Sequence, residues 1–240
     1  MPPTPPSLSH RLDTLDWPAM EQALDQDGCA VLRNLLSTPQ CQRLGALYAE
    51  PGLFRSRVIM ARHGFGRGEY QYFRYPLPDL VQSLREALYP RLVPLANRWS
   101  ERMDLNVRYP GAHLDFIQRC HAAGQQRPTP LLLQYGPQDY NCLHQDLYGE
   151  QVFPLQVAIL LSEPCRDFTG GEFVLTEQRP RMQSRPQVID LKQGDALVFA
   201  VHQRPVKGVR GYYRVNMRHG VSRVHSGRRH TLGIIFHDAQ

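Results

Sequence analysis

The stretch PTPLLLQYGPQDYNCLHQDLYGE, residues 128–150, decides how the C-terminal half of the chain is interpreted. Within it, His144 and Asp146 form a His-x-Asp pair. On an extended strand, residues i and i+2 point to the same face, so an imidazole nitrogen and a carboxylate oxygen would lie side by side. These are two of the three ligands in the 2-His-1-carboxylate triad that binds non-haem Fe(II). Because such pairs are common by chance, the rest of the chain has to supply the third ligand.

From Pro130 onward, the sequence changes to short apolar runs separated by turn residues such as Gly136-Pro137 and Gly170-Gly171. Runs of this length, bounded by glycine and proline, are typical of β-strands. Eight strands are predicted, at residues 131–135, 142–148, 155–162, 172–177, 187–191, 195–201, 215–224 and 229–237. Short strands with helices gathered upstream favour a mainly β, α+β fold, in which N-terminal helices buttress a double-sheet jelly roll.

The upstream residues carry clear helix signals. Residues 17–27 have helical apolar spacing, with Asp16 as the expected N-cap and Gly28 as the stop. A strand is expected from Cys29, and Ser37 is placed to cap the next helix. These elements predict a compact support unit ahead of the strands.

Residues 55–75, RSRVIMARHGFGRGEYQYFRY, mix glycine, aromatic residues and arginine. They predict a hairpin with a flexible tip at residues 64–68. Mobile segments of this kind often cover active sites, although a surface hairpin with solvated arginines is the simpler interpretation. Residues 78–103 predict the longest helix, which Pro90 and Pro94 should kink or divide.

The composition is that of an ordinary globular protein. The chain has 240 residues, of which 42% are hydrophobic and 21% charged, and this is enough for one large domain. We expect a disordered lead-in at residues 1–14 and a single domain at 15–240. Within that domain, residues 15–127 would form a helical support and lid region, and residues 128–240 the jelly-roll core.

Cysteine content and charge indicate the cellular compartment and the kinds of partner to expect. The five cysteines form no CxxC pair and are odd in number, which indicates reduced thiols in a cytoplasmic protein. The N-terminal MPPTPPSLSHRLD has no apolar core, so neither a signal peptide nor a membrane span is predicted. The net charge of +6 suits an anionic cosubstrate or nucleic acid.

The third ligand must be a downstream histidine that returns to the same end of the barrel. His219, in the stretch RHGVSRVHSGRRHTL, is the best candidate because alternating apolar residues follow it. The competing histidines are His202, His225, His230 and His237.

An arginine ten residues after His219 strengthens this choice. A hairpin from residues 215–224 to residues 229–237 would bring His219 and Arg229 to one cavity. A buried arginine is costly unless it is paired, and it can hold a dicarboxylate through a bidentate fork. Thr231 lies on the same strand face as Arg229, whereas Arg228 points the other way and is expected to be solvated.

The motifs resemble those of the Fe(II)- and 2-oxoglutarate-dependent dioxygenases, in particular the prolyl 4-hydroxylase-like branch. The resemblance covers most of the chain and rests on GCAVLRNLLST, LLLQYGPQDYNCLHQD, DFTGGEFVL, LKQGDALVFA and HGVSRVHSGRRHTLGIIF, in the order of the family. It implies a double-stranded β-helix, which is a cupin-like jelly roll, and a hydroxylase that releases succinate and CO2. The implied cofactors are Fe(II), 2-oxoglutarate as cosubstrate and O2, with ascorbate as a further one.

The resemblance also assigns roles to individual residues. The iron ligands would be His144, Asp146 and His219. The residues that bind 2-oxoglutarate would be Arg229 at its distal carboxylate, Thr231 in support, and Tyr135, which precedes the metal-binding strand. For Tyr135, an aromatic core residue with a satisfied hydroxyl is an equally good interpretation.

Two departures from the family pattern bear on the substrate. Residues 200–218 form an insertion-like basic stretch with Tyr212 and Tyr213, which either shapes substrate choice or is a solvated face. The interval from His219 to Arg229 does not match the branch that demethylates alkylated nucleic acids, so we do not expect nucleic acid as the partner. A protein side chain, a peptide or a small metabolite remains open as the substrate. The alternatives are a nucleic-acid-directed oxygenase or demethylase, and a non-catalytic jelly roll that binds a small acid.

Overall fold

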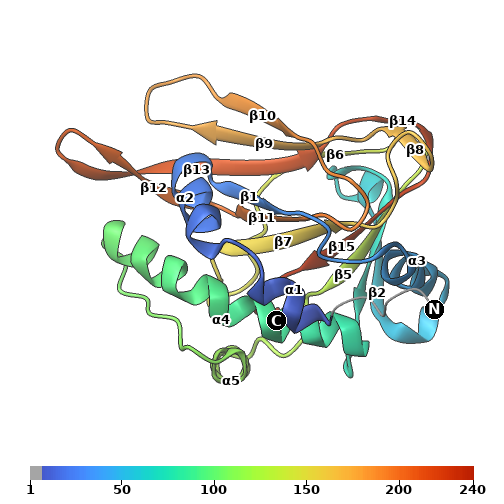
Figure 1. Ribbon diagram of the computed structural model, residues 1–240, viewed down its shortest axis with the longest axis horizontal. Helices are drawn as coiled ribbons and strands as arrows, with labels where there is room; N and C mark the ends of the chain where they lie inside the picture. Colours follow the sequence, from blue (N-terminus) through green and yellow to red (C-terminus); the bar gives the residue numbers. More distant parts are fainter. Residues whose placement is uncertain (1–6) are drawn as a thin grey trace.

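Two antiparallel sheets stack on one another in the computed structural model, which describes residues 7–240 (Figure 1). The larger one, here the major sheet, has the strand order β1-β11-β7-β15-β5-β4-β2. Its strands are β1 (Cys29–Leu32), β2 (Phe54–Ile59), β4 (Glu69–Phe73), β5 (Leu131–Tyr135), β7 (Leu155–Leu160), β11 (Ala196–Ala200) and β15 (Arg229–Ile234).

The second sheet, here the minor sheet, has the order β10-β9-β13-β6-β3, and β12 pairs with β13 beside this path. Its strands are β3 (Gly66–Arg67), β6 (Tyr140–His144), β9 (Phe173–Gln178), β10 (Arg185–Ile189), β12 (Gln203–Gly208) and β13 (Gly211–Val221). A short ribbon of β8 (Phe168–Gly170) and β14 (Val224–Gly227) joins the two layers at one end. The prediction of a double-sheet jelly roll with helices upstream is confirmed.

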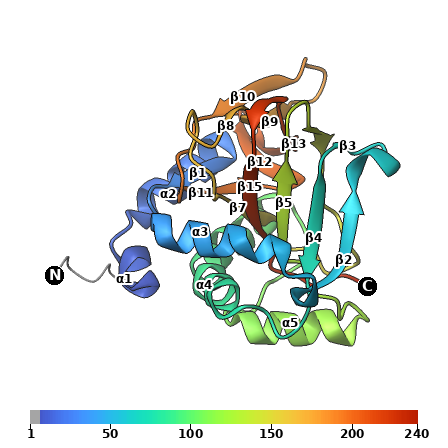
Figure 2. The same cartoon turned by 90° about the vertical axis from the view of Figure 1, so that its right-hand side faces the viewer.

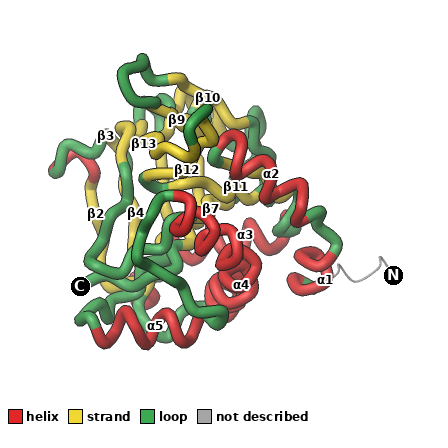
Figure 3. The backbone as a smooth tube through the Cα atoms, turned by 90° about the vertical axis from the view of Figure 1, so that its left-hand side faces the viewer, coloured by secondary structure: helices red, strands yellow, loops and turns green. Residues whose placement is uncertain are grey.

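The helices lie mainly on the major-sheet side of the molecule, where α4 and α5 run beneath the sheet, and α2 also contacts β12 of the minor sheet (Figures 1 and 2). They are α1 (Leu8–Asp13), α2 (Trp17–Asp27), α3 (Thr38–Ala46), α4 (Asp79–Arg102) and α5 (His113–Ala122), with three short 3₁₀ turns at Leu47–Ala49, Pro51–Leu53 and Met60–Arg62. Viewed from the other side, the helices again gather on one side and the minor sheet lies on the other (Figure 3). In residues 7–240, no helix combines the length and the apolarity that a membrane crossing requires.

Helix α2 begins and ends where the sequence predicts. The Asp16 carboxylate accepts a hydrogen bond from the amide of Ala19 at 3.0 Å, and Gly28 ends the helix with a φ of 75°. Only a residue without a side chain adopts this left-handed conformation freely, and a Cβ at Gly28 would lie 2.8 Å from Met217 Cε. Helix α3 likewise starts with the capping box of Ser37 and Gln40.

Helix α4 is not divided by its prolines, which rules out one of the two predicted effects, division, and leaves a kink as the other. It runs unbroken for 24 residues through Pro90 and Pro94. Each proline removes one backbone donor, so the carbonyl oxygens of Glu86 and Pro90 lose their partners four residues later. A fully buried apolar stripe that includes Leu84 and Leu88 packs the helix onto the sheet, and this packing outweighs two lost hydrogen bonds.

The prediction of a disordered lead-in over residues 1–14 is wrong where it can be compared with the structure. Residues 8–13 form α1, whose first turn is capped by Ser7, and Leu12 on this helix is fully buried. Burial of a leucine side chain contributes about 1.5–3 kcal/mol, which favours order in a short helix. Residues 1–6 lie outside the described part of the chain.

The hairpin predicted over residues 55–75 is present and belongs to the body of the fold. Its strands β2 and β4 pair with each other, and β4 pairs with β5, so the hairpin extends the major sheet. The tip carries β3, which crosses to the minor sheet and pairs with β6. The tip therefore connects the two layers beside the end of β6.

Two strand predictions need correction. The stretch 200–218, interpreted as an insertion-like loop, contains β12 and most of β13, which form a hairpin. The segments 215–224 and 229–237 were predicted to pair, but β13 pairs within the minor sheet and β15 pairs with β5 and β7 of the major sheet. The alternation of apolar residues shows that a strand exists, and it does not show which sheet the strand joins.

A large cluster of buried apolar side chains fills the space between the sheets and the helices. It contains residues from Leu12 on α1 to Ile234 on β15, so both the N-terminal helices and the last strand contribute to it. The single domain expected over residues 15–240 stays a prediction.

Candidate metal centre

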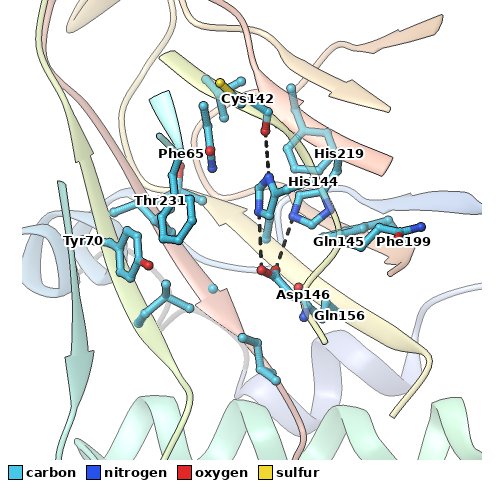
Figure 4. A pocket seen from close by; sticks show the side chains of 18 of the residues that line it. Phe65, Tyr70, Cys142, His144, Gln145, Asp146, Gln156, Phe199, His219 and Thr231 are labelled. Atoms are coloured by element: carbon cyan, nitrogen blue, oxygen red, sulfur yellow. Dashed lines mark hydrogen bonds and ion pairs between the residues drawn. The ribbon is translucent and has the colours of Figure 1, made fainter. Parts of the chain in front are cut away.

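The structure brings His144, Asp146 and His219 together between the two sheets. His144 ends β6 and lies directly opposite His219 on β13. The Nε2 atom of His144 lies 3.4 Å from Oδ1 of Asp146, and the Nε2 atom of His219 lies 3.4 Å from Oδ2 (Figure 4). One donor atom from each residue lies within 4.8 Å of the other two, a spacing that suits a single metal ion.

The backbone around Asp146 differs from the expected extended strand. Strand β6 ends at His144, so Asp146 lies two residues beyond it. The intervening Gln145 side chain donates to the carbonyl oxygen of Met217 on β13 at 2.8 Å, which ties this segment to the strand that carries His219. The carboxylate therefore reaches the two histidines from an irregular segment.

Hydrogen bonds orient the candidate ligands. Nδ1 of His144 lies 2.8 Å from the carbonyl oxygen of Cys142, so it carries the proton and leaves the Nε2 lone pair free. The hydroxyl of Tyr148 donates to Oδ1 of Asp146 at 2.7 Å. Sequence reasoning missed Tyr148 and Gln145, although the i+2 spacing of Tyr148 from Asp146 was the signal available for it.

The electrostatics of Asp146 and His219 favour a metal-ready state, whereas, although burial opposes this shift, the hydrogen bond with Asp146 raises the pKa of His144. Burial alone would raise the pKa of Asp146, but hydrogen bonds from His144 and His219 hold this pKa well below its usual value. Burial lowers the pKa of His219, and the contact with Asp146 opposes this shift only in part. Metal binding needs an ionised carboxylate and neutral imidazoles, so Asp146 and His219 are already in the required forms.

Aromatic side chains enclose His219. Its ring stacks on Phe173, with centroids 5.8 Å apart and an interplanar angle of 6°, and it tilts against Phe199 at 4.7 Å. Its side chain is 8% exposed. This wall fixes the ring and excludes water from the inner side of the centre.

Arg229, Thr231 and Tyr135 form a second group on the facing sheet. Arg229 and Thr231 lie on β15, and Arg229 is paired in register with Tyr135 on β5. The Arg229 guanidinium donates to the hydroxyl of Thr231 at 2.6 Å and lies 5.7 Å from the centroid of the Tyr135 ring. All three line the same cavity as His144, Asp146 and His219, and its volume is about 320 Å³.

The charge of Arg229 is buried and not neutralised by an ion pair. The residue is 2% exposed, and no carboxylate of residues 7–240 forms a salt bridge with it. Burial lowers its pKa to about 10, so it remains a cation at neutral pH. Its Nε atom and the hydroxyl of Tyr135 have no hydrogen-bond partner, so the site is built for an anionic ligand. The neighbouring Arg228 is exposed, as predicted.

The competing histidines lie elsewhere. His225 is exposed on β14, and His202 does not line the cavity. His230 faces Gln134 with Nε2 3.0 Å from Oε1, and Nδ1 of the buried His237 accepts from the amide of Phe153. The structure thus places only His219, among the downstream histidines, beside His144 and Asp146.

Comparison with known proteins agrees with this geometry. Residues 68–239 match the Oxygenase-NA family, whose description is "Oxygenase, catalysing oxidative methylation of damaged DNA". The match covers more than half of the chain. It contains the three candidate metal ligands and the three candidate cosubstrate residues, which are His144, Asp146, His219, Arg229, Thr231 and Tyr135. The chain belongs to the Oxygenase-NA family. Two Mycobacterium tuberculosis proteins, Rv2227 of strain H37Rv and MT2286 of strain CDC 1551, are each 50% identical to it over 167 residues, which are 70% of this chain and 72% of theirs.

Solved structures share the fold of this Oxygenase-NA member at low sequence identity. A Pseudomonas putida prolyl 4-hydroxylase is 14% identical with a TM-score of 0.54, and the match covers 93% of this chain and 99% of that one. A 2OG-Fe(II) oxygenase family oxidoreductase from Burkholderia pseudomallei is 17% identical with a TM-score of 0.55, over 94% and 93%. The resemblance to prolyl 4-hydroxylase-like dioxygenases is therefore confirmed: the protein is an oxygenase with their fold.

Proposed function

We propose that this Oxygenase-NA member is an Fe(II)- and 2-oxoglutarate-dependent hydroxylase in which His144, Asp146 and His219 hold the metal. The observation that carries the proposal is the pairing of two features in one cavity. A two-histidine, one-carboxylate donor set lies on the minor-sheet side, and a buried arginine without an ion pair lies on the major-sheet side.

The donor set fits the metal. Two imidazoles and one carboxylate on one side of an ion form the facial triad of non-haem iron oxygenases and leave open positions for further ligands. Arg229 fits the distal carboxylate of a dicarboxylic cosubstrate, because its planar fork can make two parallel hydrogen bonds to it. Tyr135 has a buried hydroxyl without a partner and is placed to donate to the same ligand.

The bound metal and cosubstrate would supply the oxidation of a substrate C–H bond by O2, with release of succinate and CO2. The protein's own residues would bind the metal and the cosubstrate, orient them and shield them from water. Asp146 and the two histidines present their donor atoms in fixed positions, and Arg229 with Thr231 sets the direction from which the cosubstrate enters. The rings of Phe173 and Phe199 keep water from the inner wall. Ascorbate would serve to keep the metal reduced.

Two measurements test this proposal. Purified protein with Fe(II) should convert 2-oxoglutarate to succinate, at a slow uncoupled rate or faster with substrate. Replacement of His219 by Ala should abolish metal binding, measured by calorimetry with Mn(II), while replacement of His202 by Ala should leave it intact. Absence of succinate formation with a fully loaded metal site would overturn the enzyme assignment, and unchanged affinity of the His219 variant would overturn the ligand assignment.

A nucleic-acid base is the second candidate, as the substrate of the same site. The description of the family names damaged DNA. The cavity lining includes the aromatic rings of Tyr70, Tyr72, Tyr148 and, near the tip of the β2–β4 hairpin, Phe65. Phe65 is 48% exposed and stacks on His63 with an interplanar angle of 23°. Aromatic walls and a free aromatic edge suit a planar base that is turned out of its stack.

Comparison of substrates tests this candidate directly. Single-stranded DNA treated with a methylating agent should stimulate succinate release, and unmodified DNA of the same sequence serves as the control. Stimulation by a proline-containing peptide and not by methylated DNA would reject the nucleic-acid base and favour a peptide, one of the substrate classes that the sequence left open.

A further inference from the structure

The outer face of the minor sheet is open at β9 and β10, which project away from the helices (Figures 1 and 2). The β12–β13 hairpin beside them touches helices at its edge, because Arg204 donates to the carbonyl oxygen of Asp25 on α2 and Arg214 to that of Met103 at the end of α4. The hairpins β9–β10 and β12–β13 project from this sheet at the same end of the molecule, away from the β8–β14 ribbon (Figure 1). They lie side by side because β9 pairs with β13 over residues 173–178 and 216–221.

Positive charge is concentrated in this part of the chain. Residues 178–218 contain nine Lys and Arg residues and two Asp residues. The net charge of this segment, nine minus two or +7, exceeds the net charge of +6 of the whole protein. The rest of the chain is therefore close to neutral. A field of one sign on one face raises the local concentration of a polyanion and speeds its association.

Negative charge is almost absent from the same sheet. Glu177 is the only carboxylate in β3, β6, β9, β10, β12 and β13. Its side chain is 5% exposed and forms ion pairs with Arg179, at 2.8 Å, and with Arg204. No carboxylate on these strands is left to neutralise the exposed cations.

The cations on this face are exposed, and several have no acidic partner. On β13, residues 212, 214, 216 and 218 are exposed while residues 215, 217 and 219 are buried, so Arg218 faces outward beside the candidate ligand His219. Arg181 and Arg210 lie in the two hairpin loops and Lys207 on β12, all exposed and without a salt bridge. Charge therefore continues along the outer face from Arg218, on the opposite side of the sheet from the inward-facing His219, to the hairpin tips.

Exposed apolar and aromatic side chains lie among the cations. Tyr212 is 42% exposed, and the guanidinium of Arg102 lies 4.8 Å from its ring centroid. Val188 on β10 and Met182 in the adjoining loop are more than half exposed. Aromatic side chains among clustered cations are a feature of surfaces on which nucleic-acid bases stack.

We infer that this face, the outer surface of the minor sheet with the two hairpins, binds the phosphate backbone of nucleic acid. The inference deepens the second candidate above, since it supplies a surface that would hold the phosphate backbone of a strand that passes round the edge of the sheet to bring a base to the cavity. Lysine and arginine side chains contact phosphates without reading sequence, so binding is expected to be sequence-independent and strongly salt-dependent. Arg218 would mark the point where the strand passes closest to the metal centre.

The test measures binding without iron, so it does not depend on catalysis. A fluorescent 20-nucleotide single strand and the matching duplex are titrated with the full chain at several salt concentrations. A variant with Arg181→Gln, Lys207→Gln and Arg210→Gln should bind more weakly, and the slope of log K against log salt should fall by roughly 2 to 3, because each lost phosphate contact removes about 0.7–0.9. The variant should keep metal binding, since none of its changes lies in the cavity.

A matched control has the same change in net charge on the opposite side. The variant with Arg43→Gln, Arg108→Gln and Arg127→Gln alters three exposed arginines on or beside α3–α5. It should bind nucleic acid like the natural protein. Equal loss in both variants, no binding by the natural protein, or equally tight binding of poly-glutamate would each overturn the inference. Binding that passes this test while methylated DNA fails to stimulate succinate release would retain the surface and reject only the substrate.

Discussion

Tyr148 is a positioning residue of the candidate centre. Its hydroxyl donates to Oδ1 of Asp146 at 2.7 Å, and its ring packs against the apolar cluster of Tyr72, Leu131 and Ile235. One carboxylate oxygen is therefore occupied, which biases Asp146 toward metal binding through the other. Partners of metal ligands typically contribute 10- to 100-fold to affinity. We expect Tyr148→Phe to weaken Mn(II) binding by about this factor, as measured by calorimetry.

The control for this change lies in the same cavity. Tyr70 also lines the cavity, and its hydroxyl makes no hydrogen bond to Asp146. Tyr70→Phe should leave the affinity for Mn(II) unchanged. If the two variants behave alike, the role of Tyr148 is to fill space rather than to hold the carboxylate.

The neighbouring arginines 228 and 229 offer a matched pair for the cosubstrate site. Arg229 is buried in the cavity and Arg228 is exposed. Arg229→Lys keeps the charge but loses the planar fork, so a charge-assisted hydrogen bond of about 1.5–3 kcal/mol is lost. The KM for 2-oxoglutarate should rise roughly 10- to 100-fold while Mn(II) affinity is retained. Arg228→Lys should change neither value, and a similar rise in both variants would contradict the assignment.

At the scale of elements, the sequence predicts local structure better than strand pairing. Helix α2 follows from its caps, and β5 from an apolar run between turn residues. The hairpin of β12 and β13 was not predicted. Its arginines and lysine are typical of a solvated loop, and only alternate residues such as Val215 and Met217 are buried. Sheet membership depends on contacts between distant residues, which one-dimensional periodicity does not contain.

The candidate site was predictable for a different reason. The types of His144, Asp146, His219 and Arg229 and their order along the chain are visible in the sequence, and the structure brings these four residues to one cavity. The predicted strands that carry these residues were wrong in detail. Asp146 lies beyond the end of its strand, and β13 and β15 lie in different sheets. Tyr148 and the open basic face emerge only once the strands are placed side by side.

A buried ion pair holds the C-terminal end of the chain against α4. Arg85 and Asp238 are both fully buried, with Nη2 2.7 Å from Oδ1, and Tyr75 and His121 also contact the Asp238 carboxylate. Asp238→Asn would leave a buried guanidinium without its counter-charge, which typically costs about 3–5 kcal/mol. Urea unfolding at pH 7 should show a loss of this size, whereas Asp115→Asn, at an exposed position of α5, should change little.

The pH dependence of this pair has a definite sign. Although burial opposes it, the charge of Arg85 lowers the pKa of Asp238 in the folded protein. The resulting stabilisation is present above the unfolded pKa of about 4 and is lost as the pH falls through the lower folded value. The difference in unfolding free energy between the natural protein and Asp238→Asn should therefore shrink in acid. A difference that stays constant from pH 7 to pH 3 would show that the pair does not carry the stability.

At the scale of the whole molecule, the site joins the two sheets. The candidate metal ligands belong to or follow strands of the minor sheet, while Arg229 and Thr231 lie on the major sheet. A metal and a dicarboxylate bound together would connect both layers, and a ligand that binds only the folded state stabilises it by about 2.7 kcal/mol at 100 times its dissociation constant. For a protein of this size, each kcal/mol corresponds to about 2–4 °C in Tm.

We therefore expect Mn(II) and 2-oxoglutarate, each at 100 times its dissociation constant, to raise the Tm by roughly 10–20 °C, compared with about 5–10 °C for Mn(II) alone. The increment from 2-oxoglutarate should disappear in Arg229→Gln, measured with the ligand at the same concentration, whereas the increment from Mn(II) should remain. This pattern requires the cosubstrate to bind through the major sheet and the metal through the minor sheet. Loss of both increments in Arg229→Gln would indicate that the arginine supports the folded cavity itself and that the division of roles between the sheets is wrong.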